Sequence, residues 1–550
     1  MKLLTKFWAI LAGATVVLSS CADLDIFSEG EIFNSEQKEN IAKQLPERLG
    51  ADLAGMYSLM STQFLVLPSS ERADDFGHPS ASLSSDLNAS DMVSTNDSYN
   101  WFTTSSSFED RTYTYSNPYI RWQLYYKQIK AANDMLKSIP SGTTDQALLF
   151  YKGQALAARA FAYLNLVYRY QFSYIGHEND PAVPLITDVA LVDETTIPRA
   201  SVQDVYEQIE SDLDQAVILL NGFVSPDKGY INKQVAFGLR ARMNLAMENW
   251  AAAAADADSA LVGTTLLTLD QVSVPGFNSV TTGTSWMWAL IINPDNIKDQ
   301  YASWPSKLCS FAGNSYTANV GCYKMINNLL WNKIANSDVR KGWWVDENLK
   351  SPLIDSVRWP GFPDDEIGAL TITDVKLAFL PYTNVKFNAD NNEFGNGDNA
   401  SDWCLMRAEE MVLIKAEGLA MSNRESEAKT WLEDYVKEYR NPSYSCTATT
   451  AQELQDEIWF QRRVELWGEG FAFWDIMRLR KDVVRFNSSV TSNFPSIFKF
   501  NISANDGWLL MRVPQRETSA NLGIPESANN NGGVLPVSGQ NPTLTDGVTD

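Results

Sequence analysis

The chain has 550 residues, of which 45% are hydrophobic and 20% are charged, and its formal net charge is −23 at pH 7. This composition is typical of a folded globular protein and not of a disordered chain. The excess of carboxylates repels phosphate, so nucleic acid is excluded as a partner and an uncharged ligand is favoured.

The first 20 residues have the order of a bacterial secretory signal. Lys2 and Lys6 precede an apolar run over residues 7–18, which is too short to span a membrane. Two small residues stand directly before Cys21, as in the lipobox of bacterial lipoproteins. The sequence therefore predicts a signal peptide that is cleaved before Cys21, and a lipid attached to that cysteine. A plain secretory signal with an incidental cysteine is the alternative.

An acidic stretch, residues 21–35, follows the signal and is interpreted as a tether. Residues 36–264 then show helical patterns and are predicted to form an N-terminal scaffold. Apolar side chains at helical spacing predict helices over residues 117–139 and 146–170.

The end of this scaffold contains the clearest sign of a repeat. Two helices are predicted over residues 202–220 and 233–247, with Ser201 and Asn232 as their N-caps. After a two-residue turn, Trp250 opens an Ala-rich helix. This order is similar to a tetratricopeptide unit, although a generic helical hairpin would pack by the same physics.

The composition changes over residues 265–400, where Gly, Pro, Asn and Trp are frequent and apolar residues no longer recur at helical spacing. We interpret this region as a large, irregular, aromatic-rich insertion that binds the ligand. Helical patterns return in the C-terminal part, residues 401–550. They predict helices over residues 403–421, 424–439 and 451–484, followed by an exposed tail.

Metal and disulfide chemistry have little support in the sequence. The four cysteines after Cys21 do not have zinc-site spacing, so neither a metal nor a cofactor is predicted. The acidic loop 390–402 lacks two of the oxygen ligands that an EF-hand needs, and a solvated loop is the better interpretation. Cys309 and Cys322 are close enough in sequence to form a disulfide, which remains one of two possibilities.

Residues 458–480 read as an amphipathic helix that breaks near two glycines, Gly468 and Gly470. Four of its charged residues have a spacing that allows ion pairs along the helix: Arg462, Glu465, Glu469 and Arg478. Considered alone, this pattern predicts a structural role.

The same residues carry a resemblance to the SusD/RagB family of surface nutrient-binding lipoproteins of Bacteroidetes. Its late signature is matched in order by Arg462, Arg463, Glu465, Leu466, Glu469, Gly470, Trp474, Asp475 and Arg478. The acidic start after Cys21, the segment 405–420 and the segment 511–517 also resemble family patterns.

The resemblance implies a mainly α fold, with a tetratricopeptide-like helical-repeat scaffold and a large irregular insertion. It also implies a lipid-anchored protein on the outer face of the outer membrane. Such a protein captures oligosaccharides, or peptides in some members, and passes them to a SusC-like TonB-dependent transporter.

Capture of a neutral sugar requires exposed aromatic rings beside polar side chains, because rings cover C–H faces and polar groups bind hydroxyls. Two places satisfy this requirement. The first is the stretch before the long helices, with Asp75, Tyr99, Asn100 and Trp101. The second is the insertion, with Trp286, Trp288, Trp304 and Tyr316. Burial in the core is the alternative for each of these tryptophans.

No catalytic residue is predicted. The sequence lacks the motifs of serine hydrolases, zinc proteases and phosphate-binding loops, and its two histidines, His78 and His177, have no evident nucleophile nearby. A pair of carboxylates that hydrolyses glycosides remains open, because it leaves no motif. A structural adaptor that binds no ligand is the other alternative.

Overall fold

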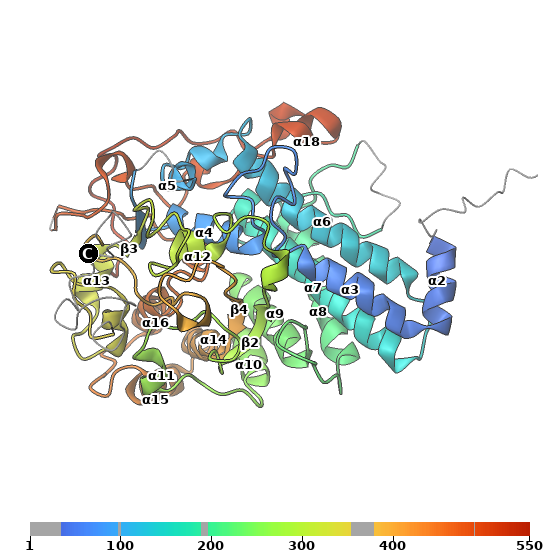
Figure 1. Ribbon diagram of the computed structural model, residues 1–550, viewed down its shortest axis with the longest axis horizontal. Coiled ribbons are helices and arrows are strands. Elements are labelled where there is room, and N and C mark those ends of the chain that lie inside the picture. The colour runs from blue at the N-terminus through green and yellow to red at the C-terminus, as the bar shows by residue number, and fades with distance from the viewer. Residues whose placement is uncertain (1–34, 97–100, 189–195, 354–378, 489) are drawn as a thin grey trace, which may run out of the picture.

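The computed structural model describes residues 35–96, 101–188, 196–353, 379–488 and 490–550. The predicted signal peptide, the tether up to residue 34, Cys21, Tyr99 and Asn100 lie outside these residues. The fold is mainly helical, as the sequence predicts (Figure 1). No helix in the described part of the chain is both long enough and apolar enough to cross a membrane.

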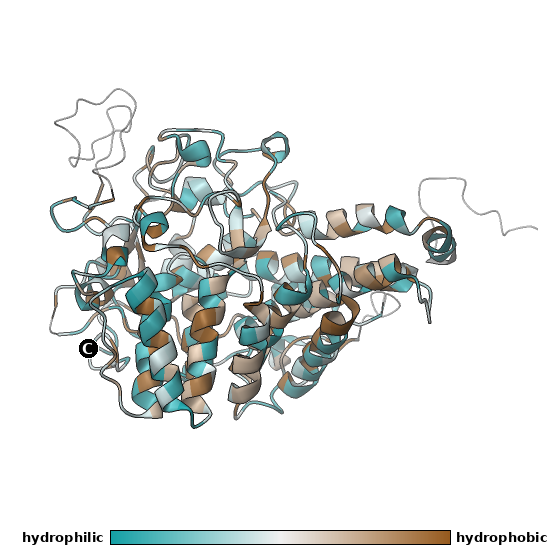
Figure 2. Ribbon diagram, turned by 90° about the horizontal axis from the view of Figure 1, so that it is seen from below, coloured by the Kyte–Doolittle hydropathy of each residue, from teal (hydrophilic) through white to brown (hydrophobic). Residues whose placement is uncertain are grey.

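The N-terminal scaffold is an array of helices in which each packs on the next. Its principal members are α6, α7, α8, α9 and α10, with α2 and α3 beside α6 (Figure 1). Their bounds, with those of two short helices, are α2 Ser35–Gln44, α3 Leu49–Ser58, α4 His78–Asn88, α5 Thr103–Ser106, α6 Ser116–Ser138, α7 Gln146–Tyr170, α8 Val202–Leu219, α9 Lys233–Ala246 and α10 Trp250–Ala260. The helices carry hydrophobic and hydrophilic residues interspersed along their length (Figure 2), as expected where one side faces a core.

The predicted helix ends agree closely with the observed ones, because the caps are local. The Ser201 hydroxyl accepts a hydrogen bond from the amide of Asp204 at 3.0 Å, and the Asp204 carboxylate accepts one from the amide of Ser201 at 3.3 Å. Asn232 accepts from the amide of Val235 at 3.0 Å. The predicted mainly α fold with tetratricopeptide-like pairs is therefore confirmed.

The region after α10 is built from short elements: α11 Leu269–Val272, β2 Trp286–Leu290, α12 Trp304–Leu308, β3 Lys324–Ile326 and α13 Asn328–Lys333. The strand β3 pairs antiparallel with β1, Met92–Ser94, and β2 pairs antiparallel with β4, Trp403–Arg407. The second pairing joins the two ends of the insertion, because β2 lies at its start and β4 directly follows it.

The chain then returns to the helical array, since α14 packs on α10. The C-terminal helices are α14 Ala408–Met421, α15 Glu425–Tyr439, α16 Ala451–Glu465, α17 Ala472–Leu479 and α18 Gln515–Ala520. The prediction of one helix over residues 403–421 is wrong at its start, where residues 403–407 form the strand β4. The predicted break at Gly468 and Gly470 is confirmed, with φ angles of 80° and 91° that favour glycine.

The residues Arg462, Glu465, Glu469 and Arg478 do not pair with one another along one helix, contrary to the expectation from their spacing; Arg462 and Arg478 both bind Asp475. Glu465 and Glu469 belong to an ion cluster with side chains from other segments: Arg340, Lys386, Arg407, Glu409 and Arg440. Glu465 lies 2.7 Å from Arg407 and 2.8 Å from Arg440. Burial alone would raise the pKa of Glu465, but the arginines lower it well below its ordinary value. The cluster ties the insertion to the C-terminal helices.

The packing decides two further points. Of the two possibilities for Cys309, the structure has the free thiol, which is buried and donates to the carbonyl of Phe387 at 3.4 Å. The tail is mostly exposed, as predicted, but Asp546 near its end is 3% exposed and accepts from Arg463 at 2.8 Å. A carboxylate buried beside a guanidinium holds this last stretch against α16.

Candidate ligand-binding site

Two half-buried aromatic residues and an exposed one meet where the N-terminal segment contacts the insertion. We call Trp101, Tyr301 and Tyr316 the aromatic cluster. The indole of Trp101 donates to the hydroxyl of Tyr316 at 2.7 Å. The rings of Tyr301 and Tyr316 meet edge to face, with centroids 5.6 Å apart, and Tyr301 is 37% exposed. Trp101 and Tyr316 also pack on the apolar side chains of Phe64, Ala73 and Ala302.

A guanidinium group lies beside this aromatic surface. The Arg72 Cζ atom is 5.3 Å from the ring centre of Trp101. Its Nε and Nη2 donate to the two carboxylate oxygens of Asp74, at 2.9 and 2.8 Å. Because Asp74 is fully buried, this two-point bond fixes the direction of the arginine.

Lys307 lies beneath the cluster. Its Nζ is 3.1 Å from the ring centre of Tyr316, the side chain is 1% exposed, and the amine has no hydrogen-bond partner. Burial lowers the pKa of Lys307 well below its ordinary value, and Lys324 lowers it further. The ring of Tyr316 is therefore supported from inside the protein.

Asp75 is not available to a ligand, so its prediction as a contact residue is wrong. It is 1% exposed, and its carboxylate accepts the backbone amides of Val66 and Leu67 at 3.1 and 3.0 Å. Its backbone carbonyl accepts from the amide of Phe64 at 2.7 Å. Asp75 thus shapes the loop on which Trp101 packs.

Two of the tryptophans that were predicted to be exposed for sugar binding are core residues. Trp286 is 3% exposed, and its ring packs so closely on Gly283 that a Cβ there would lie 2.6 Å from it. Trp288 is 0% exposed and meets Phe161 edge to face. Both lie on β2, which is buried along its whole length, so neither ring is exposed as expected.

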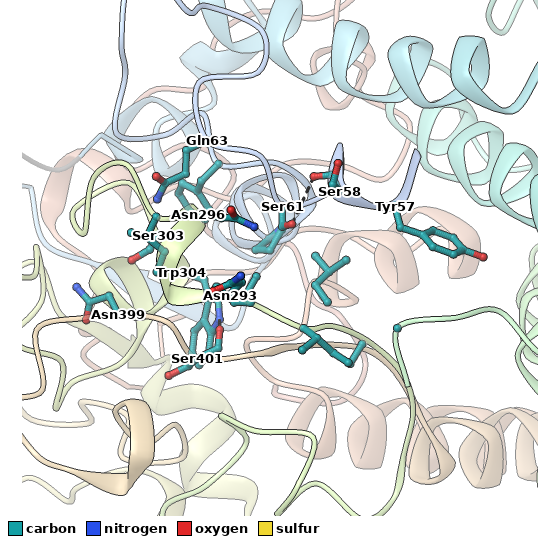
Figure 3. A pocket seen from close by; sticks show the side chains of 18 of the residues that line it. Tyr57, Ser58, Ser61, Gln63, Asn293, Asn296, Ser303, Trp304, Asn399 and Ser401 are labelled. Atoms are coloured by element: carbon teal, nitrogen blue, oxygen red, sulfur yellow. Dashed lines mark hydrogen bonds between the residues drawn. The ribbon is translucent and has the colours of Figure 1, made fainter. Parts of the chain in front are cut away.

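Trp304 is also buried, but it lines a cavity of about 300 Å³ between α3, the start of α12 and the chain after β2 (Figure 3). Its indole donates to the carbonyl of Ser401 at 2.8 Å. In Figure 3, Asn399 and Ser401 lie at the opposite end of this pocket from Tyr57. Trp304 therefore lines a pocket and does not present an exposed ring on which a sugar could stack.

The structure corrects one statement about the histidines. His78 does have hydroxyl partners, because its Nε2 is 3.2 Å from Ser82 Oγ and its Nδ1 is 3.0 Å from Tyr125 Oη. The ring is 9% exposed, and burial lowers its pKa well below the ordinary value. These contacts satisfy a core histidine that lies deep in the scaffold.

Within the described ranges, no group of three or more His, Cys, Asp or Glu side chains is placed to hold a metal ion. In the acidic loop 390–402, the carboxylate of Asp402 accepts the amides of Val280 and Ile292, both at 2.9 Å. That carboxylate therefore holds loops together.

The site combines flat aromatic faces with a fixed guanidinium, which suits a ligand that has apolar faces and hydrogen-bonding edges. Of the eight predicted contact residues, Trp101 and Tyr316 come together here across more than 200 positions of sequence. Sequence reasoning missed Tyr301 and Arg72. Tyr301 could have been identified as an aromatic residue in a polar stretch, whereas no sequence pattern points to Arg72.

The fold is that of a helical-repeat protein, and the aromatic cluster lies at its surface. Residues 71–245 match the SusD-like family described as "Starch-binding associating with outer membrane", and residues 378–531 match the SusD/RagB family, described as "SusD family". The chain belongs to the SusD/RagB family.

Relatives of known structure have the same fold. A SusD-like carbohydrate binding protein from Bacteroides vulgatus superposes with a TM-score of 0.69 at 24% identity, covering 86% of this chain and 96% of that one. A SusD superfamily protein from Bacteroides thetaiotaomicron gives 0.65 at 20% identity, covering 87% and 98%. The SusD-like protein P38 of Formosa agariphila is 24% identical over 412 residues, which is 67% of this chain and 73% of that protein.

Proposed function

We propose that this protein captures neutral oligosaccharides at the aromatic cluster. The observation that carries the proposal is the hydrogen-bonded pair of Trp101 and Tyr316, with Tyr301 at its edge and Arg72 at its side. Sugar rings stack on such faces, and a fixed guanidinium donates to their hydroxyls. The family description as starch-binding supports the same ligand class.

The proposal includes a place and a partner. The protein is tethered by lipid at Cys21 to the outer face of the outer membrane, and it hands its ligand to a SusC-like TonB-dependent transporter. The support is the lipobox in the sequence and the family description of association with the outer membrane. Mass spectrometry of the membrane-extracted protein tests the lipid, and co-purification from the same extract tests the transporter.

Binding is tested by affinity gel electrophoresis on starch, xylan and mannan, and by calorimetry with maltoheptaose, xylohexaose, mannohexaose and pentapeptides. Trp101→Ala is expected to reduce affinity about 5- to 150-fold, if a ring that stacks on sugar contributes about 1–3 kcal/mol, as a ring that stacks on a nucleic-acid base does. The truncation is expected to lower thermal stability only modestly, because Trp101 is half-buried.

Trp508→Ala is the matched control. Trp508 is also half-buried, its indole donates to a backbone carbonyl at 3.0 Å, and Arg512 lies 4.0 Å from its ring. It should lose similar stability and keep full binding. The proposal is wrong if Trp101→Ala binds like the unchanged protein. Binding of pentapeptides alone would assign a peptide-capturing role, and no binding at all would favour a structural adaptor.

We further propose that the protein has no enzymatic activity. Incubation with the polysaccharide that it binds should release no new reducing ends. Any such release that persists in a repurified sample would contradict this part of the proposal.

A further inference from the structure

The start of α6 carries a second group of surface aromatic residues. Tyr113 and Tyr115 directly precede the helix, and Tyr119 lies in its first turn. Tyr113 is oriented by a hydrogen bond from its hydroxyl to Glu526, which raises the pKa of Tyr113. Tyr115 is 43% exposed, and its side chain has no hydrogen bond or ring contact within the described residues. The ring of Tyr115 is therefore open to a partner from outside the chain.

An exposed guanidinium group lies beside these rings. The amide of Gln515, the first residue of α18, donates to the carbonyl of Tyr113 at 3.0 Å, so α18 lies beside the start of α6 (Figure 1). This contact places Arg516 over Tyr119, with its Cζ 4.5 Å from the ring centre. In the part of the chain that the structure describes, Arg516 has no ion pair or hydrogen bond from its side chain, so its donors remain available. We call Tyr113, Tyr115, Tyr119 and Arg516 the tyrosine patch.

The tyrosine patch is joined to the aromatic cluster through one buried carboxylate. The Oδ2 of Asp74 accepts from Arg72 at 2.8 Å, and Arg72 lies over the ring of Trp101. The same oxygen accepts from the Nδ2 of Asn117 at 3.1 Å. Asn117 lies in the turn of α6 that carries Tyr119. The two groups of rings are therefore close neighbours in a fixed relation.

The chain between the two groups indicates what kind of partner contacts them. Phe64 packs with Trp101 in the aromatic cluster, and Leu67 packs with Tyr119 in the tyrosine patch. The next residues, 68–71, are Pro-Ser-Ser-Glu, and all four are exposed. Hydroxyl and carboxylate groups beside aromatic rings suit a sugar chain, which has hydroxyls at its edges. Ser and Glu are depleted in protein interfaces, so this surface favours a glycan over a protein partner.

We propose that the tyrosine patch is a distal subsite, which contacts the same glycan chain beyond the sugar units held at the aromatic cluster. Tyr115 stacks on the face of a sugar ring, and Arg516 donates to a hydroxyl beside it. The choice of a glycan rests on the proposed function, whereas the open ring and the unpaired guanidinium belong to the patch itself. A short oligosaccharide occupies the aromatic cluster alone. A longer chain reaches both places, so its second contact forms within one complex and raises its affinity.

The test compares short with long chains of the same sugar by calorimetry: maltotriose with maltoheptaose, xylotriose with xylohexaose, and mannotriose with mannohexaose. Tyr115→Ala and Arg516→Ala should each weaken binding of the long chain about fivefold, the effect of one stacked ring or one hydrogen bond. Binding of the short chain should stay unchanged. Both side chains are exposed, so the melting temperature should change little in either variant.

Ile218→Ala is the matched control, because it truncates an exposed side chain at the other end of the helical array. Ile218 is 72% exposed near the end of α8, and the neighbouring Leu219 lies against Gly153 in the first third of α7. This part of α7 is close to the end of α6, whereas the tyrosine patch is at its start. The 23 residues of α6 span about 35 Å, so Ile218→Ala should bind both chain lengths as the unchanged protein does.

The two proposals fail in different ways. Long-chain affinity that is unchanged in Tyr115→Ala and Arg516→Ala but falls in Trp101→Ala overturns the distal subsite and leaves the proposed function standing. The distal subsite is also wrong if short and long chains lose affinity equally, or if the two variants only reduce co-purification with the transporter. Loss of long-chain binding in Tyr115→Ala, while Trp101→Ala changes nothing, overturns the proposed function and leaves a glycan contact at the patch. Absence of binding to all of these glycans overturns both.

Discussion

The ion cluster and the aromatic cluster use polar groups in opposite ways. In the ion cluster, Arg407 and Glu465 are buried at 1% and 0% exposure, and their charges are matched by several partners. In the aromatic cluster, Trp101 and Tyr316 are half-buried and share a single hydrogen bond. The charges of the ion cluster are paired within the protein, whereas the rings of the aromatic cluster keep exposed surface that a ligand can contact.

This difference separates the C-terminal signature from the proposed binding site. A buried charge tolerates little change, because removal of one partner leaves the other uncompensated. A stacking platform needs only a flat ring at the surface, so Tyr301 and Tyr316 belong to no motif.

The largest expected effect comes from the ion cluster. Glu465→Gln removes the negative charge between Arg340, Arg407 and Arg440, and should lower the free energy of unfolding by about 3–5 kcal/mol. Urea denaturation measures the loss. Glu427→Gln is the control, because its pair with Arg424 is about half exposed and contributes less than about 1 kcal/mol. Equal losses of stability in the two variants would mean that the buried ion cluster contributes no more than an exposed ion pair.

A smaller effect is expected where the tail meets α16. Asp546→Asn weakens the bond to Arg463, which keeps its second partner, Asp91. The free energy of unfolding should fall by about 1–3 kcal/mol in the same assay. Asp134→Asn, which alters an exposed pair with Lys130, serves as the control and should cost less than about 1 kcal/mol. A tail that contributes nothing would give the same small loss in both variants.

The smallest effect, of opposite sign, is expected beneath the aromatic cluster. Lys307→Met removes a buried amine that has no hydrogen-bond partner, and should stabilise the fold by about 1 kcal/mol near neutral pH. The pKa of Lys307 is lowered by burial, so the unfolded chain binds more protons up to about pH 10.

It follows that the unchanged protein gains stability relative to Lys307→Met as the pH rises toward about 10. Thermal denaturation of both proteins across this range measures the difference. A difference that stays constant with pH would mean that the amine is not the cause.

The sequence predicted the helices well because their signals are local. The caps at Ser201 and Asn232 and the break at Gly468 each depend on a few neighbouring residues. The site was predicted only in part. Trp101 and Tyr316, predicted in two separate stretches, come together at the surface, but no local pattern shows that Trp286 and Trp288 lie on a buried strand. That burial depends on residues distant in sequence: β4 pairs with the strand, and Phe161 of α7 packs on Trp288.

The pairing of β2 with β4 has a consequence for how ligand preference can diverge. It brings the two ends of the insertion together, so the loops between Leu290 and Trp403 leave and rejoin the fold at one pair of strands. Other contacts limit an exchange of these loops, because β3 pairs with β1 and because Arg340 and Lys386 reach into the ion cluster. A chimera that takes these loops from a related protein and retains β3, Arg340 and Lys386 should fold, and it should bind the ligand of the protein that donated the loops.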